Sequence, residues 1–129
     1  MSPSRQVVLS PDAPQPLSAY SQAIRSGSLL FLSGQVPLDP ATGQLVSGSI
    51  ALETDRVMQN LSAVLAAAGA SLQDVVKMTV YLTSMADFAE FNAAYAKYFP
   101  TAPPARSTVA VAGLPLGVRI ELEAIAAVA

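Results

Sequence analysis

The sequence predicts an α+β fold in which two helices pack on one face of a mixed β-sheet. Apolar residues alternate with a period of two in segments near both ends and in the middle of the chain, and they recur with a helical period in two segments between them. The order is therefore strands, helix, strand, helix, strands. Helices on one face of a sheet leave its other face uncovered, and we expect a partner subunit to cover that face.

The N-terminal part of the chain is expected to supply an edge strand and a β-hairpin. Residues 7–9 form a short apolar run, and residues 10–16 then break regular structure because proline fixes φ and removes a hydrogen-bond donor. Strand-like runs at 20–25 and 29–33 are joined through residues 26–28, a spacing typical of a hairpin.

The middle of the chain predicts a long amphipathic helix followed by a strand. Residues 50–68 carry apolar side chains at the spacing of a single helix face. Ser49 is suited to cap the N-terminus of this helix, and Gly69 is suited to end it. Residues 75–82 alternate and are rich in Val, Tyr and Thr, which favours a strand.

The C-terminal part predicts one more helix and two more strands. Ser84 and Asp87 approximate a capping box, which opens a helix that continues up to Pro100. The last strands are expected at residues 108–112 and 118–129. We find no internal repeat, linker or low-complexity segment, so the chain is expected to form a single domain over residues 1–129.

The composition favours an obligate oligomer. The chain has 129 residues, of which 52% are hydrophobic and only 12% are charged, whereas about a quarter of the residues of a typical soluble domain are charged. No segment reaches the ~18 consecutive apolar residues of a membrane span. The first residues lack the apolar run of a signal peptide, which favours the cytoplasm. A second buried surface, between subunits, would account for the apolar excess.

The residue types present exclude several kinds of chemistry. The chain has no cysteine and no histidine, which removes thiolate catalysis, the commonest metal ligands and the usual general base near neutral pH. We therefore expect neither a metal nor a cofactor. A net charge of −2 with scattered basic residues gives no electrostatic footprint for nucleic acid. Any reaction must depend on carboxylates, arginine, hydroxyls, amides and water.

Arg106 is the first candidate for a functional residue, because it lies in an apolar stretch where a proline-rich loop becomes a strand. An unpaired charge against apolar surface is costly, so its guanidinium needs an anion. That anion could be Glu121 or Glu123 of the same protein, or the carboxylate of a ligand. The pattern does not choose between an ion pair and a ligand site.

The final strand presents charged residues on one face. With a period of two, Arg119, Glu121 and Glu123 share that face, and Ile120 and Leu122 share the other. The simple interpretation is a solvated strand face, which the pattern favours. The alternative is that one glutamate holds a water molecule beside an apolar pocket, where a carboxylate can act as a base.

Further candidates are individually ambiguous. Tyr20, at the start of a predicted strand, is more typical of a core residue than of a site residue. Asn92 interrupts the apolar side of the second helix, and it could be a satisfied amide or could reach into a cleft. Ser33 and the two residues after it could line a pocket, although a turn is favoured.

Eight motifs in series, covering nearly the whole chain in the same order, resemble those of the reactive intermediate deaminase family (Rid, also called YjgF-type). They are Tyr20-Ser-Gln-Ala23, Phe31-Leu-Ser-Gly-Gln-Val-Pro37, Asp39-Pro-x-Thr-Gly43, Asn60 with Ala67-Ala-Gly69, Val76-Lys-Met-Thr-Val80, Phe91-Asn-Ala-Ala-Tyr95, Pro104-Ala-Arg-Ser107 and Glu121-Leu-Glu-Ala-Ile125.

The resemblance implies a chorismate-mutase-like α+β fold, assembled as a homotrimer with ligand sites in the clefts between subunits. It implies hydrolysis of 2-aminoacrylate and related enamines and imines to 2-oxo acids and ammonia, without a cofactor. In such members the residue that matches Arg106 binds the substrate carboxylate, and the residue that matches Glu121 positions the attacking water. The residues that match Tyr20, Ser33 and Asn92 line the cleft.

Two departures from the family pattern concern the pocket. Ser18-Ala19 stands where many members have Gly-Pro before the tyrosine, and Thr108 stands where many have a cysteine. Thr108 is expected to line the pocket with a hydroxyl of similar size, which excludes thiol chemistry. Both changes bear on the range of substrates more than on the reaction.

Two rival functions stay open. A non-catalytic module could bind small carboxylates in the same cleft without converting them, although the presence of both Arg106 and Glu121 favours an enzyme. An RNA-cleaving protein has precedent in the family, but the acidic charge balance and the absence of histidine disfavour it.

Overall fold

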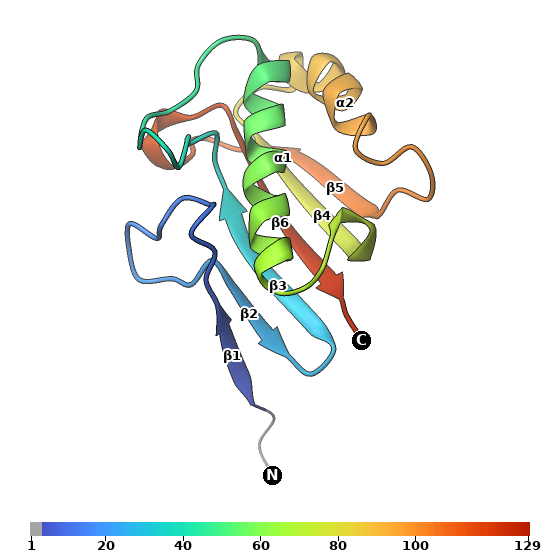
Figure 1. Cartoon of the computed structure of the whole chain (residues 1–129). Helices are drawn as coiled ribbons and strands as arrows, with labels where there is room; N and C mark the ends of the chain where they lie inside the picture. The colour runs from blue at the N-terminus through green and yellow to red at the C-terminus, as the bar shows by residue number, and fades with distance from the viewer. Residues whose placement is uncertain (1–3) are drawn as a thin grey trace.

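The computed structural model describes residues 4–129 and has a six-stranded mixed sheet and two α-helices (Figure 1). The strands are β1 (Arg5–Val8), β2 (Ala23–Ser26), β3 (Leu29–Gln35), β4 (Val75–Leu82), β5 (Ala105–Ala110) and β6 (Ile120–Ala127). The helices are α1 (Ile50–Ala67) and α2 (Phe88–Ala96). The predicted α+β class and the predicted order of elements are confirmed.

The sheet has the strand order β1-β2-β3-β6-β4-β5. All neighbours are antiparallel except β4 and β5, which run parallel because α2 connects them. The last strand of the chain, β6, therefore lies in the middle of the sheet, between β3 and β4. This insertion places the two glutamates of β6, Glu121 and Glu123, near the centre of the sheet.

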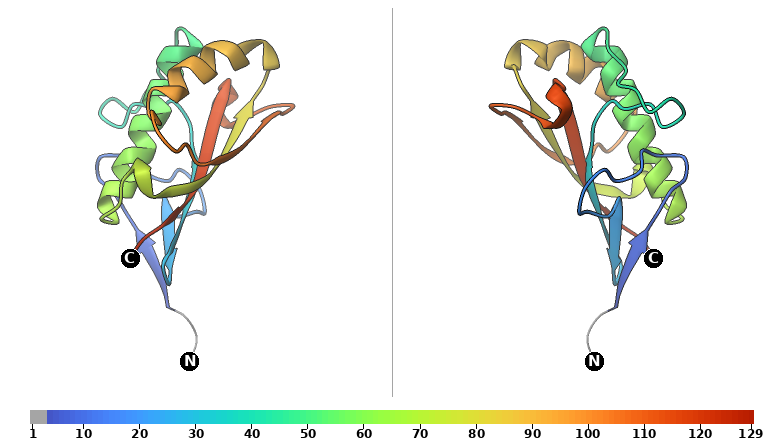
Figure 2. Two further views of the ribbon diagram at one scale, coloured as in Figure 1. Left: turned by 90° about the vertical axis from the view of Figure 1, so that its right-hand side faces the viewer. Right: turned by 90° about the vertical axis from the view of Figure 1, so that its left-hand side faces the viewer.

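Both helices cover the same face of the sheet, and Figure 2 shows the other face without a helix. Ile120 and Leu122 of β6 point toward the helices and are fully buried, whereas Glu121 and Glu123 point to the uncovered face. Large apolar side chains are exposed on that face, including Val7 of β1 and Phe31 of β3. The predicted two-layer arrangement with one open sheet face is confirmed.

The ends of α1 follow the predicted signals. The side chain of Ser49 accepts a hydrogen bond from the backbone N–H of Leu52, and Gly69, just past the helix, has φ +75°. The buried amide of Asn60 donates from Nδ2 to the carbonyl oxygens of Val36 at 3.1 Å and Leu38 at 2.9 Å. The helix thereby holds the segment that follows β3.

The second helix differs from the prediction at both ends. Ser84 caps a short 3₁₀ turn over Met85–Asp87, by accepting from the backbone N–H of Ala86, rather than α2 itself. The helix ends at Ala96 instead of reaching Pro100. The backbone N–H groups of residues 98 and 99 bond to carbonyls three residues back, so the chain tightens before the proline.

Strand boundaries also differ from the prediction; the first strand covers residues 5–8 instead of 7–9, and β3 continues to residue 35. β2 begins at Ala23 rather than at residue 20, because the buried side chain of Gln22 bonds to Ser10 and Pro14 and holds residues 10–22 as a loop. β5 begins at residue 105 rather than 108, so Arg106 lies within a strand. β6 covers residues 120–127 only.

In the part of the chain that the structure describes, neither helix combines the length and the apolar character needed to cross a membrane.

Candidate active site

Glu121 lies in β6 beside Gly34 of β3, and the contact between them explains the glycine. A Cβ atom at position 34 would collide with the carboxylate of Glu121. The pairing of β3 with β6 shifts register between Leu32 and Gln35, so residues 33 and 34 form an irregularity opposite β6. The absence of a side chain at Gly34 therefore leaves the space that the Glu121 carboxylate occupies.

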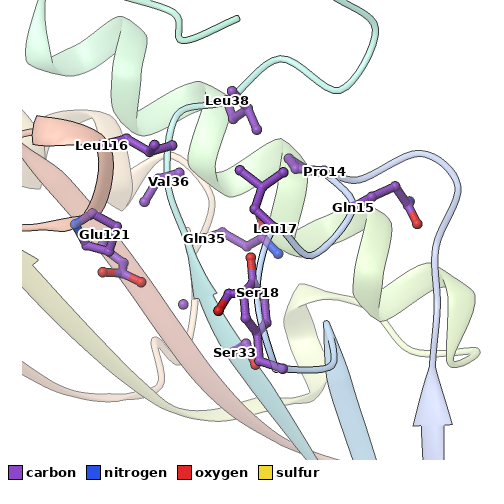
Figure 3. Close-up of a pocket in the computed structure, with 13 residues that line it drawn as sticks. Pro14, Gln15, Leu17, Ser18, Ser33, Gln35, Val36, Leu38, Leu116 and Glu121 are labelled. Carbon is purple, nitrogen blue, oxygen red and sulfur yellow. The ribbon is translucent and has the colours of Figure 1, made fainter. Parts of the chain in front are cut away.

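A cavity of about 370 Å³ lies next to this carboxylate (Figure 3). Its wall is mostly apolar, and it comes from the loop before β2, the end of β3 with the segment after it, and the loop before β6. The lining residues are Pro14, Gln15, Leu17, Ser18, Tyr20, Ser33, Gly34, Gln35, Val36, Leu38, Pro115, Leu116 and Glu121. Three of the sequence-predicted site residues, Tyr20, Ser33 and Glu121, therefore face one cavity.

The structure resolves the alternatives for Tyr20 and Ser33. Tyr20 is 48% exposed and lies in the loop before β2, so the expectation of a core residue was wrong. Ser33 belongs to β3 rather than to a turn. Its hydroxyl donates to the carbonyl oxygen of Ser21 at 2.6 Å, which leaves the lone pairs of Oγ available to a ligand donor.

The carboxylate of Glu121 has no hydrogen-bond partner among residues 4–129. Burial raises the pKa of Glu121 above its ordinary value, and the negative charge of Glu123 raises this pKa further. A partly buried carboxylate that faces a cavity and has a raised pKa is suited to hold a water molecule and to accept its proton.

The second glutamate of β6 has a different environment. Glu123 accepts a hydrogen bond from the hydroxyl of Tyr81 in β4, and this bond raises the pKa of the Tyr81 phenol. It faces a separate hollow, of about 200 Å³, together with Lys77 and Thr79. Sequence periodicity could not separate the two glutamates, because the difference depends on which residues of β3 and β4 lie beside them.

Arg106 forms the centre of a second group of site residues, against α2. Its guanidinium carbon lies 5.6, 5.7 and 5.0 Å from the ring centroids of Phe88, Phe91 and Tyr95. Its Nη1 donates to Oδ1 of Asn92 at 2.8 Å. Stacking on aromatic faces and one amide oxygen thus hold the guanidinium in place.

No carboxylate of residues 4–129 pairs with Arg106. The ion pair found in this part of the chain joins Arg119 to Glu53 of α1, and it draws Arg119 away from the face that holds Glu121. The alternative in which Arg106 forms an ion pair with Glu121 or Glu123 of the same chain is therefore wrong. The prediction that the side chain of Arg119 shares a face with Glu121 and Glu123 is wrong too. Arg106 remains able to bind an external anion.

Two buried hydroxyls near Arg106 also lack hydrogen-bond partners among residues 4–129. Thr108 lies two residues further along β5, on the same face, and its buried Oγ1 has no partner in this part of the chain. The hydroxyl of Tyr95 has no partner among the described residues either, and burial raises its pKa, an effect that the nearby Arg106 partly offsets. Buried polar groups are normally satisfied, so these hydroxyls mark positions for a water or a ligand atom.

In one chain, the two groups of site residues lie on opposite faces of the sheet. Arg106 is in register with Met78, which is fully buried under the helices, whereas Glu121 is in register with Tyr81 on the open face. A ligand bound to Glu121 therefore cannot reach Arg106 of the same chain directly. The cavity at Glu121 and the Arg106 group are two half-sites.

The half-sites contain no ligand set for a metal. In residues 4–129, no three acidic side chains cluster in a way that could hold a metal ion. What the two half-sites offer is one base, one cation, several hydroxyls and an amide. The cation, hydroxyls and amide of this set could bind a small carboxylate ligand, and the base could activate a water molecule beside it.

Comparison with known proteins gives the family. A RutC family protein of Pyrococcus horikoshii is 51% identical over 122 residues, which cover 95% of this chain and 97% of that protein. The Reactive Intermediate Deaminase A, chloroplastic, of Arabidopsis thaliana is 48% identical over 95% of this chain and 65% of its own length. The crystal structure of E. coli TdcF with bound serine superposes with a TM-score of 0.92 at 36% identity, covering 96% and 99% of the two chains.

Residues 10–128 match the family described as Endoribonuclease L-PSP. This match spans most of the chain, and it agrees with the relatives and with the order of motifs. The protein therefore belongs to the Endoribonuclease L-PSP family, which includes the YjgF and Rid proteins.

Proposed function

We propose that the protein hydrolyses reactive enamine and imine intermediates of the 2-aminoacrylate type to 2-oxo acids and ammonia. The observation that carries the proposal is the position of the Glu121 carboxylate, which lies over Gly34 beside a cavity. This carboxylate has no hydrogen-bond partner among the described residues. The name of the Arabidopsis relative, a reactive intermediate deaminase, supports the same reaction.

The chemistry needs few protein groups. After tautomerisation, 2-aminoacrylate is an imine, and its C=N carbon is already electrophilic. Glu121 would position a water molecule and accept its proton as the oxygen adds to this carbon, and the nitrogen would take up a proton. The resulting carbinolamine then loses ammonia and leaves the 2-oxo acid. Arg106 would bind the carboxylate throughout, and Ser33, Tyr20, Asn92 and Thr108 would complete the pocket.

The site requires two chains, because Arg106 and Glu121 lie on opposite faces of the sheet within one chain. A second chain packed against the open sheet face could bring its Arg106 group to the Glu121 cavity of the first. The apolar side chains exposed on that face support such packing. Together with the family resemblance, this supports a homotrimer with three equivalent sites.

A coupled assay tests the proposed reaction. A pyridoxal-phosphate-dependent serine or threonine dehydratase releases the enamine, and 2-oxo acid formation is followed with and without the protein. We expect acceleration that saturates with protein concentration and disappears in Glu121→Gln. A 2-oxo acid release rate equal to the rate of spontaneous hydrolysis would exclude the deaminase.

The second candidate is a non-catalytic module that binds small carboxylates. The specific observation in its favour is that the structure of the E. coli relative TdcF contains bound serine. Such a module would bind a 2-oxo acid through Arg106 but would leave the dehydratase assay unchanged. Calorimetric titration with a 2-oxo acid, run beside that assay, separates the two functions.

We also propose that the protein acts in the cytoplasm and has no nucleic-acid substrate. The Arabidopsis relative is named as chloroplastic, so location can differ among relatives. The net charge of −2 argues against an RNA partner, because RNA binding depends on a basic surface. Incubation with a labelled single-stranded RNA should leave the RNA intact.

A further inference from the structure

We propose that Asp55 and Tyr98 are positioning residues for the proposed reaction: the hydrogen bond between them fixes α2 against α1, and α2 in turn holds the Arg106 guanidinium where it would bind the substrate carboxylate. Neither residue takes part in the chemistry itself. The inference rests on the proposed function, because it concerns the cation of that site. It is carried by the contacts of Arg106, by the shortness of α2 and by the bonds that join the two helices.

The Arg106 guanidinium depends on α2 for its position. Its strand, β5, is an edge strand of the sheet that residues 4–129 form. The contacts that hold the guanidinium come from α2, namely three aromatic rings and the Asn92 amide. The nearest ring is that of Tyr95, whose centroid lies 5.0 Å from the guanidinium carbon. A movement of α2 relative to the sheet would therefore displace the guanidinium or remove its support.

The position of α2 depends on contacts with the rest of the fold. Its nine residues are fewer than the ~12–15 that an isolated helix needs to be stable in water. Figure 1 shows α2 beside the N-terminal part of α1. Two hydrogen bonds join the helices: the backbone N–H of Ala51 donates to Oε2 of Glu90 at 3.2 Å, and the hydroxyl of Tyr98, just past α2, donates to Oδ1 of Asp55 at 2.8 Å. Thus α1 anchors α2 near both of its ends.

The bond from Tyr98 is the anchor that bears most directly on the Arg106 group. The backbone N–H of Tyr98 donates to the carbonyl oxygen of Tyr95 at 3.0 Å, so Tyr98 is tied to the residue whose ring lies nearest the guanidinium. The bond to Asp55 is partly buried, and a hydrogen bond to a carboxylate is roughly twice as strong as one between neutral groups. Burial, together with the bond to Asp55, raises the pKa of Tyr98 to about 12, so the phenol remains a donor at neutral pH.

Removal of the Tyr98 hydroxyl should weaken carboxylate binding more than catalysis. In Tyr98→Phe the ring remains but the bond to Asp55 is lost, so the KM and the Kd for pyruvate should rise about tenfold, while kcat falls by less than about threefold. Asp55→Ala should have the same effect. Asp55→Asn keeps an oxygen that accepts from the phenol, and it should restore most of the affinity. An unchanged Kd in both Tyr98→Phe and Asp55→Ala would overturn the proposal.

The matched control is Asp74→Ala. Oδ2 of Asp74 accepts from the backbone N–H of Ser71 at 2.9 Å, so this variant also removes a hydrogen bond to a carboxylate. The bond lies in the 3₁₀ turn that follows the C-terminal end of α1, far from α2 (Figure 1). Asp74→Ala should keep the wild-type Kd. A loss of affinity as large as that in Tyr98→Phe would show that any loss of stability weakens binding, and the positioning role would be wrong.

Mixed assemblies separate the positioning of Arg106 from a general loss of stability. In the shared site, Arg106 comes from one chain and Glu121 from its neighbour, so Glu121→Gln and Arg106→Ala chains together form intact sites. Tyr98→Phe added to the Glu121→Gln chain, which supplies Arg106, should lower kcat/KM of the mixture about tenfold. The same change added to the Arg106→Ala chain should leave kcat/KM unaffected. Equal losses in the two mixtures would overturn the proposal.

A spectroscopic measurement tests the positioning role without any ligand or reaction. The Nε–Hε signal of Arg106, identified by its absence in Arg106→Ala, should lie upfield because three rings surround the guanidinium. In Tyr98→Phe and Asp55→Ala this signal should move toward that of a free arginine, and in Asp74→Ala it should not move. If the wild-type protein neither binds pyruvate nor converts imines, the proposed function fails, and this signal alone decides the positioning role. An Arg106 signal at its wild-type position in both Tyr98→Phe and Asp55→Ala would overturn it.

Discussion

At the scale of single residues, the two candidate catalytic groups are held in different ways. Three aromatic rings and the Asn92 amide fix the Arg106 guanidinium, and no carboxylate of residues 4–129 neutralises it. The Glu121 carboxylate is placed by the space above Gly34, and burial raises its pKa. A cation that no carboxylate of the described residues neutralises, and a carboxylate with a raised pKa, both gain from a ligand that brings a carboxylate and a water molecule.

Replacement of Arg106 should affect substrate binding much more than folding. Loss of a charge-assisted pair to a bound carboxylate costs about 2–5 kcal/mol, so Arg106→Ala should lower kcat/KM by roughly 30-fold to several thousand-fold. Arg106→Lys should restore little activity, because an ammonium cannot reproduce the planar fork or the stacking on Tyr95. Steady-state kinetics and thermal melts check both variants. Near-normal turnover in Arg106→Ala would show that Arg106 serves structure alone.

The two glutamates of β6 should differ in their effects. Glu121→Gln should lower kcat by about 10²–10⁴, the usual range for a positioned acid–base group, with little change in the affinity for a 2-oxo acid. Glu123→Gln should keep most of the turnover at neutral pH and lower stability by about 1 kcal/mol, because it weakens the bond from Tyr81. If Glu123→Gln instead abolished turnover and Glu121→Gln did not, the catalytic base would be Glu123 and not Glu121.

The pH dependence of turnover provides a separate check. Burial raises the pKa of Glu121, and the charge of Glu123 raises this pKa further. Glu121 acts as a base only when it is ionised, so turnover should fall as the pH drops through the raised pKa. Removal of the Glu123 charge lowers the pKa of Glu121. The acid limb of kcat/KM in Glu123→Gln should therefore move to lower pH. If the acid limb of kcat/KM in Glu123→Gln stayed at the wild-type pH, a group other than Glu121 would control the loss of turnover at low pH.

At the scale of elements, the site depends on the irregular pairing of β3 with β6. The register shift between Leu32 and Gln35 places Gly34 under the Glu121 carboxylate. Asn60 of α1 binds the carbonyl oxygens of Val36 and Leu38, and so fixes the segment that continues the cavity wall. The position of the Glu121 carboxylate therefore depends on α1, on the irregularity in β3 and on the central strand β6.

A methyl group at position 34 tests this arrangement. Gly34→Ala should displace the Glu121 side chain and lower kcat by at least tenfold, because a small shift of a positioned base is costly. Gly113→Ala is the control, since Gly113 has an ordinary φ and no atom within 4 Å of the added Cβ. Assays of both variants beside thermal melts separate displacement from unfolding. Equal activity in the two variants would contradict the packing described for Glu121.

At the scale of the whole molecule, the sheet divides the functional groups between its two faces. The helix face carries Arg106, and the open face carries Glu121. One chain has the parts of a site but cannot bring them to the same ligand. Assembly of chains is therefore part of the proposed chemistry and does more than stabilise the fold.

Light scattering should give a mass of about 40 kDa, three times the chain mass of 13.3 kDa. Mixed assemblies test the shared site more directly. Co-expressed Arg106→Ala and Glu121→Gln chains should regain about one-quarter of wild-type activity, because roughly that fraction of sites would combine an intact Arg106 with an intact Glu121 from the neighbouring chain. A 13.3 kDa species, or mixed assemblies as inactive as each variant alone, would contradict the shared site.

The sequence by itself determined the class of fold, the order of its elements and the family. Periodicity, the Ser49 cap and Gly69 predicted α1 almost to its ends, because these signals act between neighbouring residues. The motifs also pointed to Arg106 and Glu121 as the residues to examine. The start of β2 and the end of α2 were missed because they depend on contacts such as the bonds of Gln22 to a loop twelve residues away.

Only the tertiary structure decided how the site is divided. Local pattern could not tell Glu121 from Glu123, since the difference comes from Gly34 on one neighbouring strand and Tyr81 on the other. It could not exclude an ion pair between Arg106 and the glutamates, because strand order and register set the face to which each side chain points. The apolar wall at Leu116 was also hidden, because it forms where loops distant in sequence meet. Short-range signals fix elements, and long-range packing fixes which side chains share a cavity.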